Sequence, residues 1–347
     1  MAATDRNDRI LNIEAASGAS AGDGRPVSVE VALATYNSAR FLAELLDSLF
    51  AQTNQDFTLL VADDGSADDT MGILDRYSRA NPGRIRIVAC GRQAHGPAGN
   101  FGRLLDSATA DYVLLCDHDD VWLPDKIGET LAHLRKLEAA GPPGTPILVH
   151  TDLRLVDADL EVISPSFFEF SKLQPHLNDV RRLLLSNVAT GCTMVINRAL
   201  YERARPVPPE AVMHDHWLAL VASAVGEIGC MREATILYRL HGGNTIGVRP
   251  PGAASTFERV YQTLFSRERY RAILRYSSQA AALLARVGGE MKPSERRAAE
   301  ALAAMPATSP WRRYRMLRRN GLRLPGSVRD VALLIVVTRG AGRGKAQ

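Results

Sequence analysis

The first third of the chain alternates between the spacing of strands and the spacing of helices. Val27 to Ala34 is a short run rich in β-branched residues, and from Phe41 to Phe50 the apolar positions recur at helical intervals. The same succession follows, with a strand-like run from Phe57 to Ala62 and a helical stretch from Asp68 to Arg79. Strands that alternate with helices in this way predict a parallel sheet.

The pattern continues over the next forty or so residues. Arg84 to Ala89 and Asp111 to Cys116 are predicted strands. Between them Pro97 to Ala108 is predicted as a helix, because proline is tolerated in a helix's first turn. The expected fold class is α/β, with a doubly wound, mixed but mostly parallel sheet flanked by helices. In such sheets ligands bind at the carboxyl ends of the strands.

Two Pro- and Gly-rich breaks divide the rest of the chain. After Gly141 to Gly144 the pattern loosens into short strands, and after Pro250 to Gly252 it becomes Ala- and Arg-rich and helical to about Arg319. The predicted strands are Ile147 to Thr151, Cys192 to Ile196, Glu227 to Met231 and Thr235 to Leu240. The predicted organisation is a disordered tail over 1–26, a domain over 27–250 with halves 27–120 and 121–250, and a basic helical extension over 251–347.

Composition narrows the class of protein. The 347 residues are 46% hydrophobic, and 42 Lys plus Arg against 38 Asp plus Glu give a net charge of +4, too balanced for a protein that coats nucleic acid. The four cysteines form no C-x-x-C pair. The first residues lack the basic start and apolar run of a signal peptide, and no apolar run reaches the length of a spanning helix. We therefore expect a cytoplasmic protein.

The basic charge is concentrated at the C-terminal end. Trp311 to Gln347 contains ten Lys or Arg residues and the single acid Asp330, interleaved with aromatic residues and the apolar strip Val331 to Val337. This composition suits peripheral docking on the anionic inner face of the plasma membrane. The alternative is a solvated Arg-rich helix, since the whole chain uses 37 arginines and 5 lysines.

Acidic residues follow two of the predicted strands. Asp63 and Asp64 end the second strand, and the run from Asp117 to Asp120 ends the fourth. In an extended segment residues i and i+2 point the same way, so Asp117 and Asp119 are expected to converge on one site. Two hard oxygen donors suit Mg²⁺ or Mn²⁺. The alternative for either acid pair is a helix cap or a solvated turn.

With these motifs in order, the chain resembles glycosyltransferase family 2, which has the GT-A fold, and within it the bacterial rhamnosyltransferase-like members. The resemblance covers about Val27 to Val248. It rests on five ordered pieces, Val31 to Asn37, Val61 to Ser66, Gly99 to Trp122, His214 to Trp217, and Tyr238 to Asn244.

The resemblance implies a nucleoside-diphosphate sugar held by the N-terminal half. The residues it assigns to this donor are Thr35, Tyr36, Asn37, Asn100, Asp63 or Asp64 at the base, and Asp117 at the ribose. Strand alternation lets only one of Asp63 and Asp64 point inward, and the sequence does not say which. Asp119 would ligate Mg²⁺ or Mn²⁺, and His241 follows a predicted strand at a turn that would bring it to the same ion, unless it is a surface or core histidine.

Asp215 is the residue expected to act as general base on the acceptor hydroxyl. The alternatives are that it caps a helix from Trp217 to Ala224, or that His214 or His216 is the base. Trp217 is expected either to stack on a sugar, as an acceptor-binding residue, or to anchor the core. The chemistry would be a single displacement with inversion, because no nucleophile for a retaining route is evident.

The function that follows is a metal-dependent inverting glycosyltransferase. By resemblance the sugar is rhamnose from dTDP-rhamnose, and the acceptor is a glycan or lipid-linked saccharide in cell-surface polysaccharide synthesis. No nucleic-acid partner is expected. The alternatives are a sugar-phosphate nucleotidyltransferase, although its Gly-rich, Lys-bearing loop is absent from the sequence, and a non-catalytic glycan-binding module on the same fold.

Overall fold

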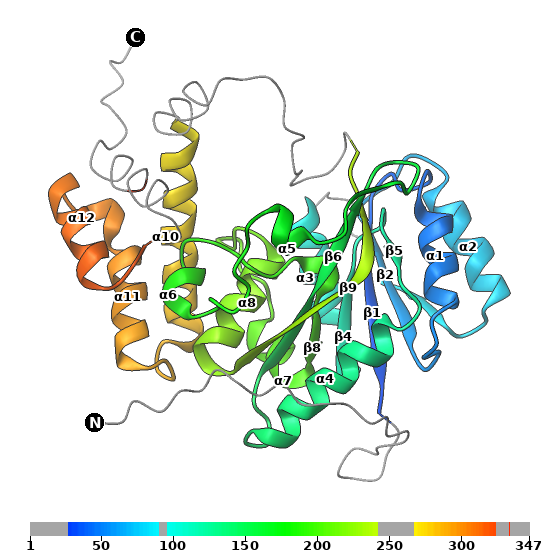
Figure 1. The fold of residues 1–347 in the computed structure, drawn as a ribbon, viewed down its shortest axis with the longest axis horizontal. Coiled ribbons are helices and arrows are strands. Elements are labelled where there is room, and N and C mark those ends of the chain that lie inside the picture. Colours follow the sequence, from blue (N-terminus) through cyan, green and yellow to red (C-terminus); the bar gives the residue numbers. More distant parts are fainter. Residues whose placement is uncertain (1–26, 90–95, 242–266, 324–332, 334–347) are drawn as a thin grey trace.

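The computed structural model describes residues 27–89, 96–241, 267–323 and 333. A mixed sheet runs through its centre, with helices on both faces (Figure 1), which confirms the predicted α/β class. The strand order is β3-β2-β1-β4-β8-β6-β9-β5, with β7 paired to β6. The predicted tail over 1–26 and the boundary at Pro250 to Gly252 lie outside the described residues.

The N-terminal half follows the predicted strand and helix order. Its four strands, β1 (Val29–Thr35), β2 (Thr58–Asp63), β3 (Ile85–Ile87) and β4 (Tyr112–Cys116), pair in parallel. Its helices are α1 (Leu42–Phe50), α2 (Thr70–Ala80) and α3 (Gly96–Ser107). Buried side chains alternate between two cores: Leu33 and Val61 pack with α1 and α2, whereas Ala34 and Ala62 pack with α3.

The second half continues the same sheet with mixed pairing. It contains β5 (Val121–Trp122), β6 (Ile147–Val156), β7 (Val162–Ser164), β8 (Val195–Asn197) and β9 (Glu227–Arg239). Strand β8 is antiparallel to β4 and β6, and β6 is parallel to β9. The two strands predicted between Glu227 and Leu240 are one strand, because register shifts against β6 absorb its polar middle. The strand predicted from Cys192 begins instead as a 3-10 turn, η1 (Gly191–Thr193).

The helices of the second half cover both faces. They are α4 (Lys126–Ala140), α5 (Phe167–Phe170), α6 (Val180–Leu183), α7 (Arg198–Ala204) and α8 (His214–Val225). Helix α4 shares its core with α1 and α2, and α8 shares its core with α3.

The C-terminal helices pack on the same core as α8. They are α10 (Arg267–Val287), α11 (Pro293–Ala303), the 3-10 turn η2 (Met305–Ala307) and α12 (Pro310–Arg319). Leu283 and Leu302 are fully buried and belong to one hydrophobic cluster with Leu218 of α8. These helices therefore form an outer layer on the α8 side of the sheet, as Figure 1 shows in yellow to orange.

Across the described part of the chain, every helix is too short or too polar to cross a bilayer. The apolar strip Val331 to Val337 lies outside the described residues except for Leu333, which is buried. The three described cysteines, Cys116, Cys192 and Cys230, are free thiols.

Candidate active site

A cavity of about 870 Å³ opens where β1, β2 and β4 end. Asp64, Asp119 and Asp215 all line it, although up to 151 positions separate them along the chain. The predicted residues on its wall are Thr35, Tyr36, Asn37, Asp64, Asn100, Asp117, Asp119, Asp215 and His241. Parallel strands bring their carboxyl ends to one edge of the sheet, which is why acids from distant segments meet here.

Asp63 and Asp64 point to opposite sides, and the structure distinguishes them. The Asp63 carboxylate accepts hydrogen bonds from the Thr35 hydroxyl at 2.8 Å, from the Gly65 and Ser66 backbone N–H groups at 3.0 and 2.8 Å, and from the Ser66 hydroxyl at 2.6 Å. It does not line the cavity. Asp63 therefore fixes the loop after β2, and its assignment to the base is wrong.

Asp64 faces the cavity from the same loop. Its Oδ2 accepts a hydrogen bond from the Gly96 backbone N–H at 2.8 Å, and its Oδ1 lies 3.7 Å from the guanidinium of Arg103, a residue that the sequence reading missed. Of the two acids, Asp64 is thus the one placed to meet a ligand.

The two predicted asparagines on the cavity wall differ in their hydrogen-bond partners. Asn100 donates from Nδ2 to the Ala62 carbonyl at 2.8 Å, and its buried Oδ1 has no partner among the described residues. An unpaired buried acceptor is costly, so this oxygen is suited to accept a hydrogen bond from a ligand. Asn37 instead adopts a left-handed φ of 47° and accepts from the Ala67 N–H at 2.8 Å, which joins two loops. Tyr36, 54% exposed, lies at the rim.

The acidic run from Asp117 to Asp120 is a turn between β4 and β5 and not an extended segment. The extended conformation predicted for this run is therefore wrong, yet Asp117 and Asp119 line the same cavity, as predicted. Burial, and then the charges of Asp119 and Asp215, raise the pKa of Asp117 to about 7. Asp119 Oδ2 lies 2.8 Å from His241 Nε2.

Arg239 holds this turn in place, and the sequence reading missed it. It is 2% exposed at the end of β9, and its Nε donates to the Asp119 carbonyl at 3.0 Å. Its guanidinium also pairs with Glu44 of α1 and lies 4.4 Å from the ring centroid of Phe41. The Phe41 ring is in turn 5.1 Å from the ring of His241. In the sequence, the only feature that pointed to Arg239 was its position two residues before His241.

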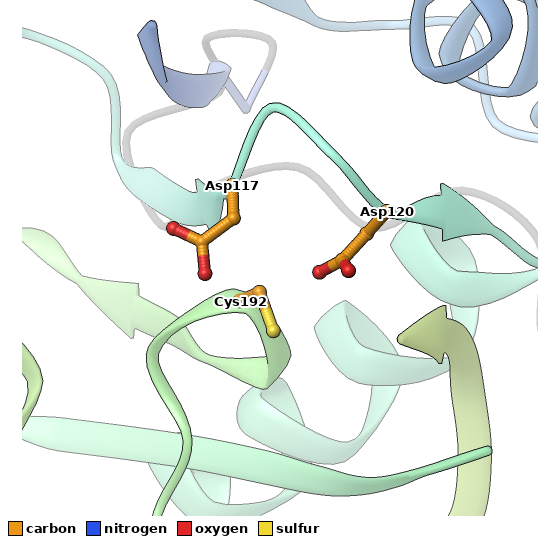
Figure 2. Close-up of side chains that lie close together, drawn as sticks. All are labelled: Asp117, Asp120 and Cys192. Carbon is orange, nitrogen blue, oxygen red and sulfur yellow. The ribbon is translucent and has the colours of Figure 1, made fainter. Parts of the chain in front are cut away.

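Two acids of this turn also form a group with a cysteine from another segment. Ligand atoms of Asp117, Asp120 and Cys192 are within 4.8 Å of one another, and Figure 2 shows these three side chains gathered around the turn. Burial, and then the neighbouring acids, raise the pKa of Asp120 and of the Cys192 thiol. The thiol of Cys192 is a poor ligand for Mg²⁺ or Mn²⁺, which prefer oxygen donors.

The wall residues fit a divalent cation better. Asp117 and Asp119 are close enough for the charge of one to raise the pKa of the other, so a cation between them would relieve their repulsion. Carboxylate oxygens with one imidazole, from His241, are suitable ligands for Mn²⁺ or Mg²⁺.

Asp215 lies in the first turn of α8, near enough to the acidic turn for its charge to raise the pKa of Asp117. The helix begins at His214, with Met213 as its N-cap, so Asp215 is not the cap of a helix that starts at Trp217. Its carboxylate accepts from the His216 N–H at 2.6 Å and from the Gly191 backbone. Burial raises the pKa of Asp215 to about 6. A carboxylate of this pKa can take a proton near neutral pH.

The two flanking histidines do not compete for this role. His216 Nε2 faces the Leu183 carbonyl and its Nδ1 faces Gln279, away from the cavity. The ring of His214 stacks on Phe101 with centroids 3.8 Å apart, and both of its nitrogens are buried. Burial lowers the pKa of His216 to about 4 and of His214 to about 3. His214 lines the cavity, but these lowered pKa values make both rings weaker bases than Asp215.

Trp217 does not reach the cavity. It is fully buried in the core with Leu218, and its Nε1 donates to the Ala204 carbonyl at 2.8 Å. The acceptor-binding role is therefore wrong, and the core alternative is correct. The sequence reading instead missed the apolar residues that the second half adds to the wall, among them Leu153, Phe167, Leu173, Val188 and Met213.

Comparison with known proteins identifies the family of the chain. The model of glycosyl transferase family 2 matches residues 30–204. An uncharacterized glycosyltransferase of Nostoc is 25% identical over 225 residues, 63% of this chain and 66% of the relative. The dTDP-rhamnosyl transferase RfbG of Shigella flexneri is 28% identical over 229 residues, 62% of this chain and 73% of RfbG.

The fold is also found among solved structures. Residues 1–349 of TarS from S. aureus, in complex with UDP-GlcNAc, superpose with a TM-score of 0.52 at 18% identity, covering 86% of this chain and 93% of that one. This likeness agrees with the predicted GT-A fold.

The raised pKa of Asp117 predicts a pH-dependent effect of Asp117→Asn. Between about pH 4 and pH 7 the folded protein holds the Asp117 proton more tightly than the unfolded chain, so the wild type loses stability as the pH rises. Asparagine carries no such charge. In chelator, the free energy of unfolding of the variant should exceed that of the wild type by more at about pH 8 than at about pH 4.

Urea titrations at the two pH values measure this difference. Asp125→Asn, at an exposed acid outside the cavity, is the control and should show no comparable trend. An equal stability difference at both pH values would contradict the repulsion described for Asp117.

Proposed function

The chain belongs to glycosyl transferase family 2 and is a glycosyltransferase, and from this premise we propose that it is a metal-dependent, inverting enzyme. Its donor is a nucleoside-diphosphate sugar and its acceptor is a saccharide hydroxyl. The observation that supports the proposal is the cavity shared by Asp64, Asp119 and Asp215. The family match sets aside the alternatives of a nucleotidyltransferase and a non-catalytic binding module.

In this proposal the N-terminal half binds the donor nucleotide. Asp64 accepts a hydrogen bond from the base, and Asp117 accepts one from the ribose. The unpaired Oδ1 of Asn100 accepts a further hydrogen bond from the donor. Thr35, Tyr36 and Asn37 complete the wall on this side.

Asp119 and His241 would hold the divalent cation. When bound, Mg²⁺ or Mn²⁺ would neutralise the negative charge that grows on the departing diphosphate. The support for this pair is the 2.8 Å contact between Asp119 Oδ2 and His241 Nε2, an oxygen and a nitrogen that both suit such a cation.

Asp215 takes the proton of the acceptor hydroxyl. The hydroxyl oxygen then attacks the anomeric carbon on the face opposite the nucleoside diphosphate, so the new glycosidic bond forms as the bond to the diphosphate breaks. A single displacement of this kind inverts the anomeric centre. A pKa of about 6 leaves Asp215 ionised at neutral pH, ready for the proton.

For the donor we propose dTDP-rhamnose, and for the acceptor a glycan or lipid-linked saccharide of a cell-surface polysaccharide. The support is the likeness to RfbG, whose name gives it a dTDP-rhamnosyl activity.

We further propose that α12 docks on an anionic membrane surface. Trp311 is 70% exposed, and Arg312, Arg315 and Arg319 are exposed on the same helix. Arg313 is not part of this surface, because it is 8% exposed and donates to the Met305 carbonyl at 3.0 Å. Each arginine near an anionic surface contributes about 1 kcal/mol to binding.

Asp215→Asn should lower kcat by about 10²- to 10⁴-fold, because the amide cannot take the acceptor proton. Donor affinity should change far less than kcat, since Asp215 makes no proposed contact with the donor and acts on it only through its charge near Asp117. Steady-state transfer assays and donor titrations measure the two effects. Glu210→Gln, an exposed acid five residues earlier, is the control and should keep full activity. Full turnover in Asp215→Asn would overturn the base assignment.

Asp119→Ala should weaken Mn²⁺-dependent donor binding by about 10- to 100-fold or more. Mutating a residue that only hydrogen-bonds to a metal ligand already lowers metal affinity by about this factor, and Asp119 is proposed as a ligand itself. Thermal stabilisation by dTDP-rhamnose and by UDP-GlcNAc, with and without Mn²⁺, measures the effect and ranks the two donors. Asp125→Ala is the matched control outside the cavity. Tight donor binding to Asp119→Ala, independent of Mn²⁺, would refute the metal site.

Replacing Arg312, Arg315 and Arg319 together by glutamine should lower binding to phosphatidylserine vesicles by about 10- to 100-fold. Flotation of the full chain at low and high salt measures this, and the wild type should be released by salt. Arg76 and Arg79 of α2, both exposed, replaced in the same way are the control. Equal flotation of wild type and triple variant would mean that α12 is a solvated helix.

A further inference from the structure

Helix α10 contacts the segment that carries Asp215 through one fully buried amide. Gln279 is 0% exposed. Its Oε1 accepts a hydrogen bond from the Val212 backbone N–H at 2.7 Å, and its Nε2 lies 3.3 Å from His216 Nδ1. Val212 precedes Asp215 and His216 follows it, so the amide bridges the chain across this acid.

The partners of Gln279 are chemically matched. The Leu183 carbonyl only accepts hydrogen bonds, so His216 Nε2 must carry the ring proton and Nδ1 is the acceptor. Nδ1 therefore requires a donor, which the NH₂ group of Gln279 supplies, while the Val212 N–H requires an acceptor, which Oε1 supplies. An apolar side chain of the same size satisfies neither group.

The beginning of α8 has no side-chain cap. Its N-cap, Met213, has no side-chain oxygen to bond the first N–H groups. The Asp215 carboxylate accepts from the N–H of His216, at 2.6 Å, so any shift of His216 moves the hydrogen bond that orients this carboxylate. Tyr276, also on α10, packs edge-on against the His216 ring at 5.7 Å.

We propose that Gln279 is a positioning residue for Asp215, so that the C-terminal helical layer completes the active site from behind. This inference rests on the proposed role of Asp215 as the base. Gln279 does not line the cavity, and it therefore acts on turnover through Asp215 without touching donor or acceptor. Because a misplacement of about 1 Å can cost 10²-fold in rate, a small movement of this carboxylate is enough to be measured.

Gln279→Leu in the full chain should lower kcat by about 10- to 100-fold and leave the donor Kd unchanged. The acidic limb of the kcat/KM profile should also move above its wild-type position near pH 6, because the His216 N–H bond lowers the pKa of Asp215 and a weaker bond raises it. Ser277→Ala is the matched control. Ser277 is 2% exposed on the same helix, but its hydroxyl donates to the Ala303 carbonyl of α11 at 3.1 Å.

Asp215→Asn combined with Gln279→Leu separates this inference from the proposed function. If Gln279 acts through Asp215, adding Gln279→Leu to Asp215→Asn should cause no further loss of transfer. An equal fold-loss in both backgrounds, or a wild-type kcat in Gln279→Leu, overturns the inference. Full activity in Asp215→Asn alone would instead overturn the base assignment.

Gln279→Met provides the measurement if the leucine variant does not fold, since its unbranched side chain has no N–H to donate to His216 Nδ1 and only a weakly accepting sulfur for the Val212 N–H. It should show the same loss of kcat with an unchanged donor Kd. A Gln279→Met enzyme with wild-type kcat and pH profile would also refute the positioning role.

Discussion

Mutual repulsion among Asp117, Asp119 and Asp215 is the constraint that the rest of the site has to meet. The charges of Asp119 and Asp215, together with burial, raise the pKa of Asp117 to about 7. Isolated carboxylates would move apart or bind protons. Hydrogen bonds from other segments keep these acids together. Arg239 donates to the backbone of the acidic turn, and the backbone of η1 donates to the Asp215 carboxylate. A positive charge that entered this site would relieve the repulsion.

The two sides of the cavity are supported by different parts of the fold. The donor side depends on regular parallel strands, whose register places Asp63 beside Thr35 and lets Asp63 fix the loop that presents Asp64. The side that carries Asp215 depends on the irregular η1 turn, on the start of α8 and on α10 behind it. Local regularity thus supports the proposed nucleotide site, whereas contacts between distant segments support the proposed base.

This division also explains what the sequence predicted. The strands of the first half and the residues at their ends were found from periodicity, because period and chain position alone define them. The roles of Asp63, Arg239 and Gln279 depend on partners far away in the chain, such as Glu44 for Arg239 and Val212 for Gln279. The spacing of residues along the chain does not predict contacts between such distant pairs.

The error at Trp217 has the same physical origin. A tryptophan two residues after the proposed base can face a sugar or the core, and the helix that carries it decides between the two. Because α8 begins at His214, Asp215 faces the cavity while Trp217 is turned inward to the Ala204 carbonyl.

The buried contacts of the C-terminal layer have a consequence for any surface that α12 presents. Leu317 of α12, Leu302 of α11 and Leu283 of α10 belong to one continuous core with Leu218 of α8. Close-packed cores transmit position because they deform little. The exposed arginines of α12 therefore keep a fixed orientation relative to Asp215. A membrane that binds those arginines would therefore determine the direction in which the cavity faces. Membrane docking would then also determine how an acceptor reaches the cavity, whereas a flexible tether would leave this orientation free.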